Sequence, residues 1–300
     1  MGLTDSQKRL IQSISECDMQ SAKKCAIACL TEDTTEKNKW FVSKYKQILT
    51  SSGANMMELP SDLKTILFAE DVSNSFKEKR YYLSGREKEV YETIVRMKKV
   101  NEKLTEIGIP YINSTLLYGE SGTGKTTFGK YVAYKLGLPF VYLKFSNLVD
   151  SYMGSTSKNI SKAFSYATSN PCVFMLDEID CISIKRSGSG DSGGTDGEMA
   201  RITITLMQEF DKLTNEIIVI GATNRKDRID EALLNRFSLK HEVKAFNEEE
   251  KLEMIKKFLN DVDVRIGYNE LEPIIKSTNS QRVIISELIR KIANIIAEEI

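Results

Sequence analysis

The chain has 300 residues, enough for one large domain or for two to three smaller ones. Its 41% hydrophobic residues suffice for a buried core, and its 42 basic and 42 acidic residues cancel, so the net charge does not indicate a nucleic-acid or membrane partner. We find no signal peptide, no apolar run long enough to span a membrane, and five cysteines without metal or redox spacing, and we therefore expect a cytoplasmic protein with reduced thiols.

The first 60 residues carry helical periodicity and no strand pattern. Trp40, Phe41, Tyr45 and Ile48, for example, recur at the spacing of one helix face. The spacing predicts a small all-helical domain over residues 1–60.

Beyond this domain the pattern changes. Residues 61–82 are expected to be a connector with a short helix. Short apolar strands then alternate with helices, which implies parallel pairing and an α/β core over residues 83–246. Residues 247–300 carry only helical periodicity. Strands are expected at 115–118, 140–144, 173–176, 217–222 and near 239–243. Helices are expected at about 87–106, 157–168 and 198–212, and another helix is expected to end at 136.

Residues 119–126 read G-E-S-G-T-G-K-T directly after an expected strand, which is the P-loop pattern. Its glycines let backbone N–H groups converge on one anion. Lys125 adds a positive charge for the β- and γ-phosphates, and the Thr126 hydroxyl is placed to ligate Mg²⁺. The loop therefore predicts a nucleoside triphosphate site made by Gly119, Glu120, Ser121, Gly122, Thr123, Gly124, Lys125, Thr126 and Thr127.

The strand expected at 173–176 ends in Asp177 and Glu178. A buried parallel strand delivers its carboxyl end to the ligand crevice, so both acids are expected beside the P-loop. Asp177 would hold Mg²⁺ together with Thr126, as a Walker-B aspartate does. Glu178 would orient and polarise the attacking water.

The strand expected at 217–222 is followed by Thr223 and Asn224. The Asn224 amide can donate to a γ-phosphate or hold the water without adding charge. The alternative is an asparagine that caps a turn. We favour the catalytic interpretation because neighbouring strand ends converge on one site.

Together these segments resemble the AAA family of ATPases. The resemblance covers roughly residues 83–300, extends to stand-alone bacterial or phage members, and includes residues 222–237, which are similar to the family's second region of homology. It implies an AAA+ core with a parallel five-stranded sheet, a C-terminal helical lid over residues 247–300, ATP and Mg²⁺ bound between them, and a ring that is usually a hexamer. It also places Asn224 at the sensor-1 position.

The resemblance assigns Arg236 to the arginine-finger position, from which a neighbouring subunit neutralises charge at the γ-phosphate. Many relatives carry two arginines here, whereas this chain has Asn235 before Arg236. The role in trans therefore rests on Arg236, with Arg225 and Arg228 as further candidates for the same interface. The alternative for Arg236 is a structural salt bridge.

Tyr152, Met153 and Gly154 follow the second expected strand and resemble the triplet that lines the central pore of AAA unfoldases. A ring of large amphipathic side chains can grip many polypeptides, and a glycine lets the loop move. The alternative is a pair of core residues.

Two further positions leave alternatives open. Ser280, Gln281 and Arg282 begin a helical segment that resembles the nucleotide-sensing position of the lid, where the family often has Gly-Ala. Arg282 either reaches the phosphates or is solvated. His241, the single histidine, is expected to be structural.

The sequence thus predicts Mg²⁺-dependent ATP hydrolysis by a homo-oligomeric ring that remodels, unfolds or threads a polypeptide, with residues 1–60 recruiting substrate or a partner protein. One alternative is a nucleic-acid motor or clamp-loading ATPase, which would require a basic pore or a basic appended domain. Another is a slow ATP-dependent scaffold or switch, which the presence of Glu178 and Asn224 disfavours and Asn235 leaves open.

Overall fold

The chain forms two compact units, Met1–Asn55 and Met56–Ile300. The computed structural model describes residues 3–15, 19–33, 35–43, 55–56, 59–60, 62–146, 148, 155–182, 194–214 and 217–298. The expected pore residues Tyr152, Met153 and Gly154 lie outside these described residues.

The described part of the smaller unit is helical, as its periodicity predicts. Helices α1 (Asp5–Ser15) and α2 (Met19–Glu32) pack against each other, and a short 3-10 helix, η1 (Glu36–Asn38), follows. Trp40 and Phe41, two residues of the expected helix face, are 70% and 50% exposed. The other residues of that face lie outside the described ranges.

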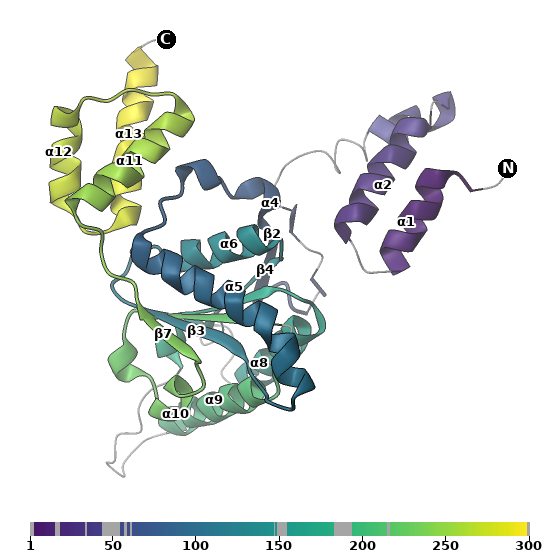
Figure 1. The fold of residues 1–300 in the computed structure, drawn as a ribbon, viewed down its shortest axis with the longest axis horizontal. Helices are drawn as coiled ribbons and strands as arrows, with labels where there is room; N and C mark the ends of the chain where they lie inside the picture. Colours follow the sequence, from purple (N-terminus) through teal and green to yellow (C-terminus); the bar gives the residue numbers. More distant parts are fainter. Residues whose placement is uncertain are drawn as a thin grey trace. The chain divides into compact units, whose positions relative to one another are not determined.

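The larger unit contains a sheet with helices packed around it (Figure 1). The strand order of the sheet is β1-β2-β4-β5-β6-β3-β7. All five expected strands form, and they pair in parallel. The expected sheet of five strands is nevertheless too small, because β2 pairs antiparallel with β4 and β1 lies beyond it. The strands are β1 (Asn55–Met56), β2 (Leu67–Asp71), β3 (Asn113–Tyr118), β4 (Phe140–Lys144), β5 (Val173–Asp177), β6 (Ile218–Thr223) and β7 (Leu239–Glu242).

Residues 61–82 are part of the core rather than the connector that we expected. They contain β2, α4 (Val72–Ser75) and the 3-10 helix η2 (Glu78–Arg80). Leu63 and Ala69 are buried with the main apolar cluster of the sheet. Because β2 is short and a polar stretch follows it, its sequence carries little strand signal.

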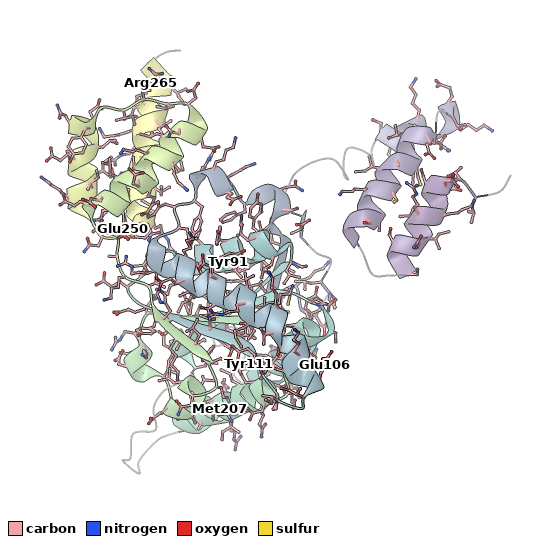
Figure 2. The ribbon with its side chains drawn as sticks, in the orientation of Figure 1. Tyr91, Glu106, Tyr111, Met207, Glu250 and Arg265 are labelled. Carbon is pink, nitrogen blue, oxygen red and sulfur yellow. The ribbon has the colours of Figure 1, made fainter. Side chains whose placement is uncertain are left out.

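Helices cover both faces of the sheet, as buried parallel strands require. Successive residues of β5 point to opposite faces: Phe174 joins one apolar cluster and Met175 the other. Tyr91 and Met207, on helices of the two layers, pack against these separate clusters (Figure 2). One layer comprises α5 (Gly85–Glu106) and α6 (Lys125–Leu136), and the other comprises α8 (Thr156–Ser169) and α9 (Gly194–Asp211).

The C-terminal segment is helical, as expected, and has its own apolar cluster that includes Ile255 and Leu288. Its first helix begins at a capping box in which Asn247 and Glu250 satisfy each other's backbone N–H groups. Among the described residues, no helix combines the length and apolar content that crossing a bilayer requires. The helices of this segment are α11 (Glu248–Val262), α12 (Tyr268–Ser277) and α13 (Gln281–Glu298), and α10 (Glu231–Leu234) precedes β7.

Candidate functional site

The P-loop joins β3 to α6 and has the backbone of an anion cradle. Gly122 and Gly124 adopt φ values of 80° and 91°, which glycine reaches without a steric penalty. Gly124 is the N-cap of α6, and as a glycine it has no side chain that could cap the helix. The N–H groups of the first helical turn therefore remain open to an anion, towards which the helix dipole is positive.

Lys125 is buried at the start of α6, with 7% of its surface exposed. Its ammonium donates to the carbonyl oxygens of Gly119 and Glu120, each at 2.8 Å. Burial lowers the pKa of Lys125, the carboxylates of Asp177 and Asp180 oppose that shift, and Arg282 adds to it. Both acceptors are uncharged carbonyl groups, and the ammonium has a third N–H group that can donate to a phosphate oxygen.

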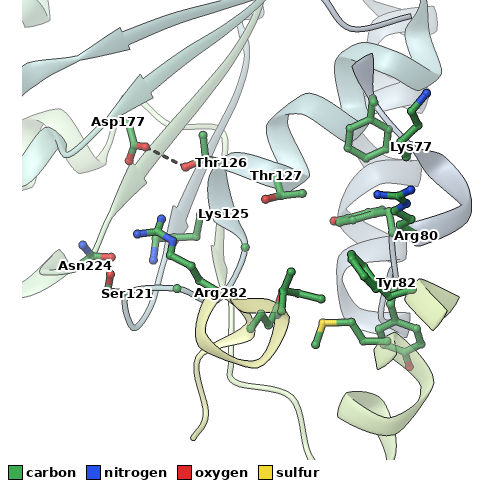
Figure 3. A pocket seen from close by; sticks show the side chains of 18 of the residues that line it. Lys77, Arg80, Tyr82, Ser121, Lys125, Thr126, Thr127, Asp177, Asn224 and Arg282 are labelled. Atoms are coloured by element: carbon green, nitrogen blue, oxygen red, sulfur yellow. Dashed lines mark hydrogen bonds between the residues drawn. The ribbon is translucent and has the colours of Figure 1, made fainter. Parts of the chain in front are cut away.

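Asp177 ends β5 and lies against the P-loop helix. Thr126 Oγ1 donates to Asp177 Oδ2 at 2.9 Å (Figure 3), and the Tyr142 hydroxyl of β4 donates to the same oxygen at 3.1 Å. Burial and the charge of Asp177 raise the pKa of Tyr142, which keeps that hydroxyl a donor. The structure thus brings together the hydroxyl and carboxylate that the sequence assigns to Mg²⁺, and both offer the oxygen ligands that Mg²⁺ prefers.

Glu178 has a left-handed backbone conformation, with φ of 56°. Such values are uncommon for residues other than glycine and cluster at functional sites. Its N–H donates to Asp177 Oδ1 at 2.9 Å, and its Oε1 lies 3.0 Å from Nζ of Lys144. These contacts fix Glu178 in the pocket wall. Lys144 is the register partner of Asp177 on the neighbouring strand, a contact that no local pattern in the sequence signals.

Asn224 follows β6 and faces the same pocket. The end of its strand is anchored, because Thr223 Oγ1 donates to Asp180 Oδ1 at 2.6 Å and the N–H of Arg225 donates to Thr223 Oγ1 at 2.9 Å. Asp180 was not among the residues predicted for the site, although it lies only three residues after Asp177. Through Thr223, Asp180 links the end of β5, where Asp177 and Glu178 lie, to the end of β6, which Asn224 follows.

One pocket of about 420 Å³ is lined by most of the expected P-loop residues and by Asp177, Glu178 and Asn224. The expected residues Gly119, Glu120 and Thr123 do not line it. Its remaining wall is largely aromatic and apolar, which suits the base of a nucleotide. Part of this wall comes from residues 61–82, the segment that we expected to be a connector. Three aromatic residues of that segment, Phe76, Tyr81 and Tyr82, line the pocket. The wall includes Phe76, Arg80, Tyr81, Tyr82, Met254, Phe258 and Ile285.

The start of α13 lies directly on the P-loop. Gln281 Nε2 donates to the carbonyl oxygen of Thr123 at 2.9 Å. The backbone N–H of Arg282 donates to the carbonyl oxygen of Gly122 at 3.4 Å. The Arg282 side chain extends into the pocket beside Lys125 (Figure 3). This placement favours phosphate contact over a purely solvated arginine.

Arg236 is not among the residues that line the pocket of its own chain. Its Nε and Nη2 donate to the two carboxylate oxygens of Asp211, each at 2.8 Å, and its Nη1 donates to the carbonyl oxygen of Ala232 at 2.9 Å. The guanidinium lowers the pKa of Asp211. This ion pair is the structural salt bridge that the alternative interpretation of Arg236 expects, and a role at a phosphate would require a second subunit.

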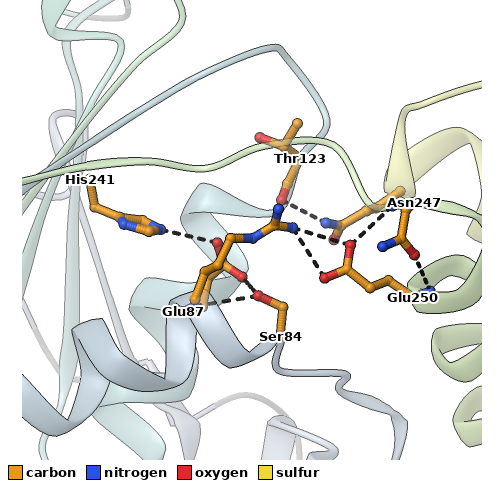
Figure 4. Close-up of polar contacts among 8 residues, drawn as sticks. Ser84, Glu87, Thr123, His241, Asn247 and Glu250 are labelled. Atoms are coloured by element: carbon orange, nitrogen blue, oxygen red, sulfur yellow. Dashed lines mark hydrogen bonds and ion pairs between the residues drawn. The ribbon is translucent and has the colours of Figure 1, made fainter.

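The other expected polar residues make local contacts. Arg225 pairs with Asp227 at 3.2 Å, and Arg228 and Asn235 are exposed. His241 Nε2 lies 3.1 Å from an oxygen of Glu87 (Figure 4), which agrees with a structural role.

Comparison with known proteins identifies one family. Residues 115–245 match the model of the ATPase family associated with various cellular activities (AAA). The chain is 32% identical to the peroxisomal ATPase PEX6 of Candida glabrata over 225 residues, which cover 74% of this chain and 22% of that protein. It is 39% identical over 150 residues to the human and Saccharomyces cerevisiae proteins of the same name, covering 49% of this chain and 15% and 14% of those proteins. The chain thus spans at most 22% of the length of these relatives. All three are eukaryotic, and the expected bacterial or phage affiliation stays a prediction.

Proposed function

Because this chain carries an ATPase domain of the AAA family, matched over residues 115–245, we propose that it hydrolyses ATP with Mg²⁺ as a subunit of a homo-oligomeric ring. The observation that carries the proposal is the convergence of the P-loop, Asp177, Glu178 and Asn224 on one pocket. Three segments far apart in the sequence supply these groups, and each has the chemistry that phosphoryl transfer to water needs.

Each side chain has a distinct task in this proposal. The P-loop N–H groups and Lys125 bind the phosphates, and Thr126 with Asp177 would hold the metal. Mg²⁺, when bound, neutralises charge on the phosphate oxygens. Glu178 accepts a proton from the attacking water, whose oxygen bonds to the γ-phosphorus as the bond to ADP breaks. Asn224 orients that water.

The ring itself is proposed from Arg236. The side chain is hydrogen-bonded to Asp211 outside the pocket of its own chain, so the cation for the γ-phosphate would come from the neighbouring subunit. We propose a hexamer in line with the family resemblance.

We further propose that the ring acts on a polypeptide. The family resemblance and the balanced charge of the chain support this reading over a nucleic-acid motor. Tyr152, Met153 and Gly154 are the proposed pore residues, and residues 1–60 are the proposed site for a substrate or partner protein. The names of the relatives state only that they are peroxisomal ATPases.

The substitution Glu178→Gln tests the hydrolytic role. It is expected to lower kcat by about 10²-fold or more, because general base catalysis typically contributes that much, while ATP binding persists. Glu242→Gln, which changes an exposed carboxylate on β7, is the control and should leave kcat unchanged.

The same variant also tests the substrate class. In the presence of ATP, the trapped Glu178→Gln protein should retain polypeptides. Co-purifying nucleic acid would favour the motor alternative, and an unchanged kcat would rule out the assigned role of Glu178.

A further inference from the structure

Lys251 is a buried cation that the proposed hydrolysis does not use. It lies on α11 with 5% of its surface exposed, and its Nζ donates to the carbonyl oxygen of Ile275 at 3.0 Å and to Oδ1 of Asn279 at 3.1 Å. Both of these acceptors are uncharged, one a backbone carbonyl and the other a side-chain amide oxygen. A buried ammonium is costly unless its hydrogen bonds are satisfied. Ile275 helps here because it lies in the last turn of α12, where the helix dipole is negative.

One acceptor of Lys251, Ile275, lies at the end of α12, and the other, Asn279, lies in the turn that joins α12 to α13. This turn contains no regular structure, so its polar groups depend on a few individual hydrogen bonds. Inside the turn, the N–H of Ser280 donates to Thr278 Oγ1 at 3.1 Å. The hydrogen bonds from Lys251 connect this turn and the end of α12 to α11.

The same turn leads directly onto the P-loop. Gln281 and Arg282 make the two hydrogen bonds to P-loop carbonyls described above. The packing is tight, since a methyl group added at Gly122 would lie 2.1 Å from Ser280 Oγ. A small displacement of the turn therefore changes how Gln281 and Arg282 meet the phosphate-binding loop.

The helix that carries Lys251 is itself anchored to the core. The preceding residue, Glu250, accepts from Nη2 of Arg86 at 3.1 Å with both of its oxygens, and it completes the capping box with Asn247 (Figure 4). Glu250 thus contacts α5 of the core, and the next residue, Lys251, contacts the segment that leads to the P-loop.

We propose that Lys251 is a positioning residue for nucleotide binding: by holding Ile275 and Asn279, it keeps Gln281 and Arg282 in place on the P-loop. This inference rests on the proposed function to the extent that the pocket must bind a nucleotide. It does not depend on hydrolysis or on the ring.

The test is the affinity of the full chain for the fluorescent nucleotide mant-ADP. Lys251→Met keeps the aliphatic stem but leaves two acceptors unpaired, and it should raise Kd about tenfold, in line with the loss of such hydrogen bonds. Asn279→Ala, in an exposed turn position that does not line the pocket, should raise Kd in the same direction. Lys256→Met removes an exposed lysine of the same helix and should leave Kd within about twofold.

A double-mutant cycle separates positioning from a general loss of stability. If Lys251 acts through the P-loop contact, Lys251→Met and Gln281→Ala together should raise Kd by less than the product of their separate effects. If Lys251→Met does not fold, the same cycle with Asn279→Ala decides the question.

Failure of the inference and failure of the proposed function give different results. Multiplicative effects, or values of Kd within about twofold for both Lys251→Met and Asn279→Ala, would overturn the inference and leave the nucleotide site intact. A chain without substitutions that does not bind mant-ADP would overturn both.

Discussion

Arg236 makes the proposed shared site depend on one guanidinium. The residue before it is an exposed asparagine, Asn235, which adds no second cation. The three hydrogen bonds from Arg236 to Asp211 and Ala232 fix the direction of the side chain. An arginine that is held in advance loses less entropy when it meets a phosphate, so we infer that Asp211 prepares it for the neighbouring subunit.

The substitution Asp211→Asn should therefore affect the transition state more than binding. We expect kcat to fall about tenfold with KM for ATP unchanged, because the proposed contact from the neighbour stabilises charge that develops during transfer. Steady-state ATPase kinetics measure both constants. Glu287→Gln, which breaks the ion pair with Arg290 on α13, is the matched control and should leave kcat unchanged. A raised KM with an unchanged kcat would contradict the assignment.

The part of the site that could be predicted from sequence is the part that lies in contiguous motifs. The P-loop, Asp177 and Glu178, and Asn224 each follow an apolar strand, and strand ends converge in a parallel sheet. Tyr142 and Asp180 could not be found this way. Their partners lie 35 and 43 residues away, and only the pairing of β5 with β4 and β6 brings them together.

The same distinction holds for secondary-structure elements. The five parallel strands are apolar, separated by helices and recognisable by that alternation. The strand β2 pairs with β4, about 70 residues later in the chain, and offers only five residues before a helix begins. Its assignment depends on contacts that no local pattern contains, and for that reason residues 61–82 read as a connector.

A buried ion pair shows that β2 belongs to the core. Glu70 of β2 is 6% exposed and lies 2.7 Å from Nζ of Lys130 on α6. Glu70→Ala should lower the free energy of unfolding by about 2 kcal/mol, because it leaves a partly buried ammonium without its partner. Urea titration measures this change. Asp62→Ala removes an exposed partner of Lys162 and should have no measurable effect. Equal effects of the two substitutions would place β2 outside the cooperative core.

At the scale of the whole molecule, the described residues hold most of a hydrolytic site but leave Arg236 outside it. The P-loop, the acids, Asn224 and Arg282 converge within Met56–Ile300, whereas Arg236 pairs with Asp211. Our proposal of a site that two subunits complete rests on this placement of Arg236.

The most direct test of this central claim is the ATPase rate of a mixed assembly. Arg236→Ala lacks the finger but keeps its own Glu178, and Glu178→Gln lacks the base but keeps its own Arg236. Each variant alone should be nearly inactive. Co-assembled in equal amounts, they should recover about a quarter of the rate of the unsubstituted protein, because random placement in a ring pairs the two intact halves at about one site in four. A mixture that shows only the mean of the two separate rates would contradict a site shared between subunits.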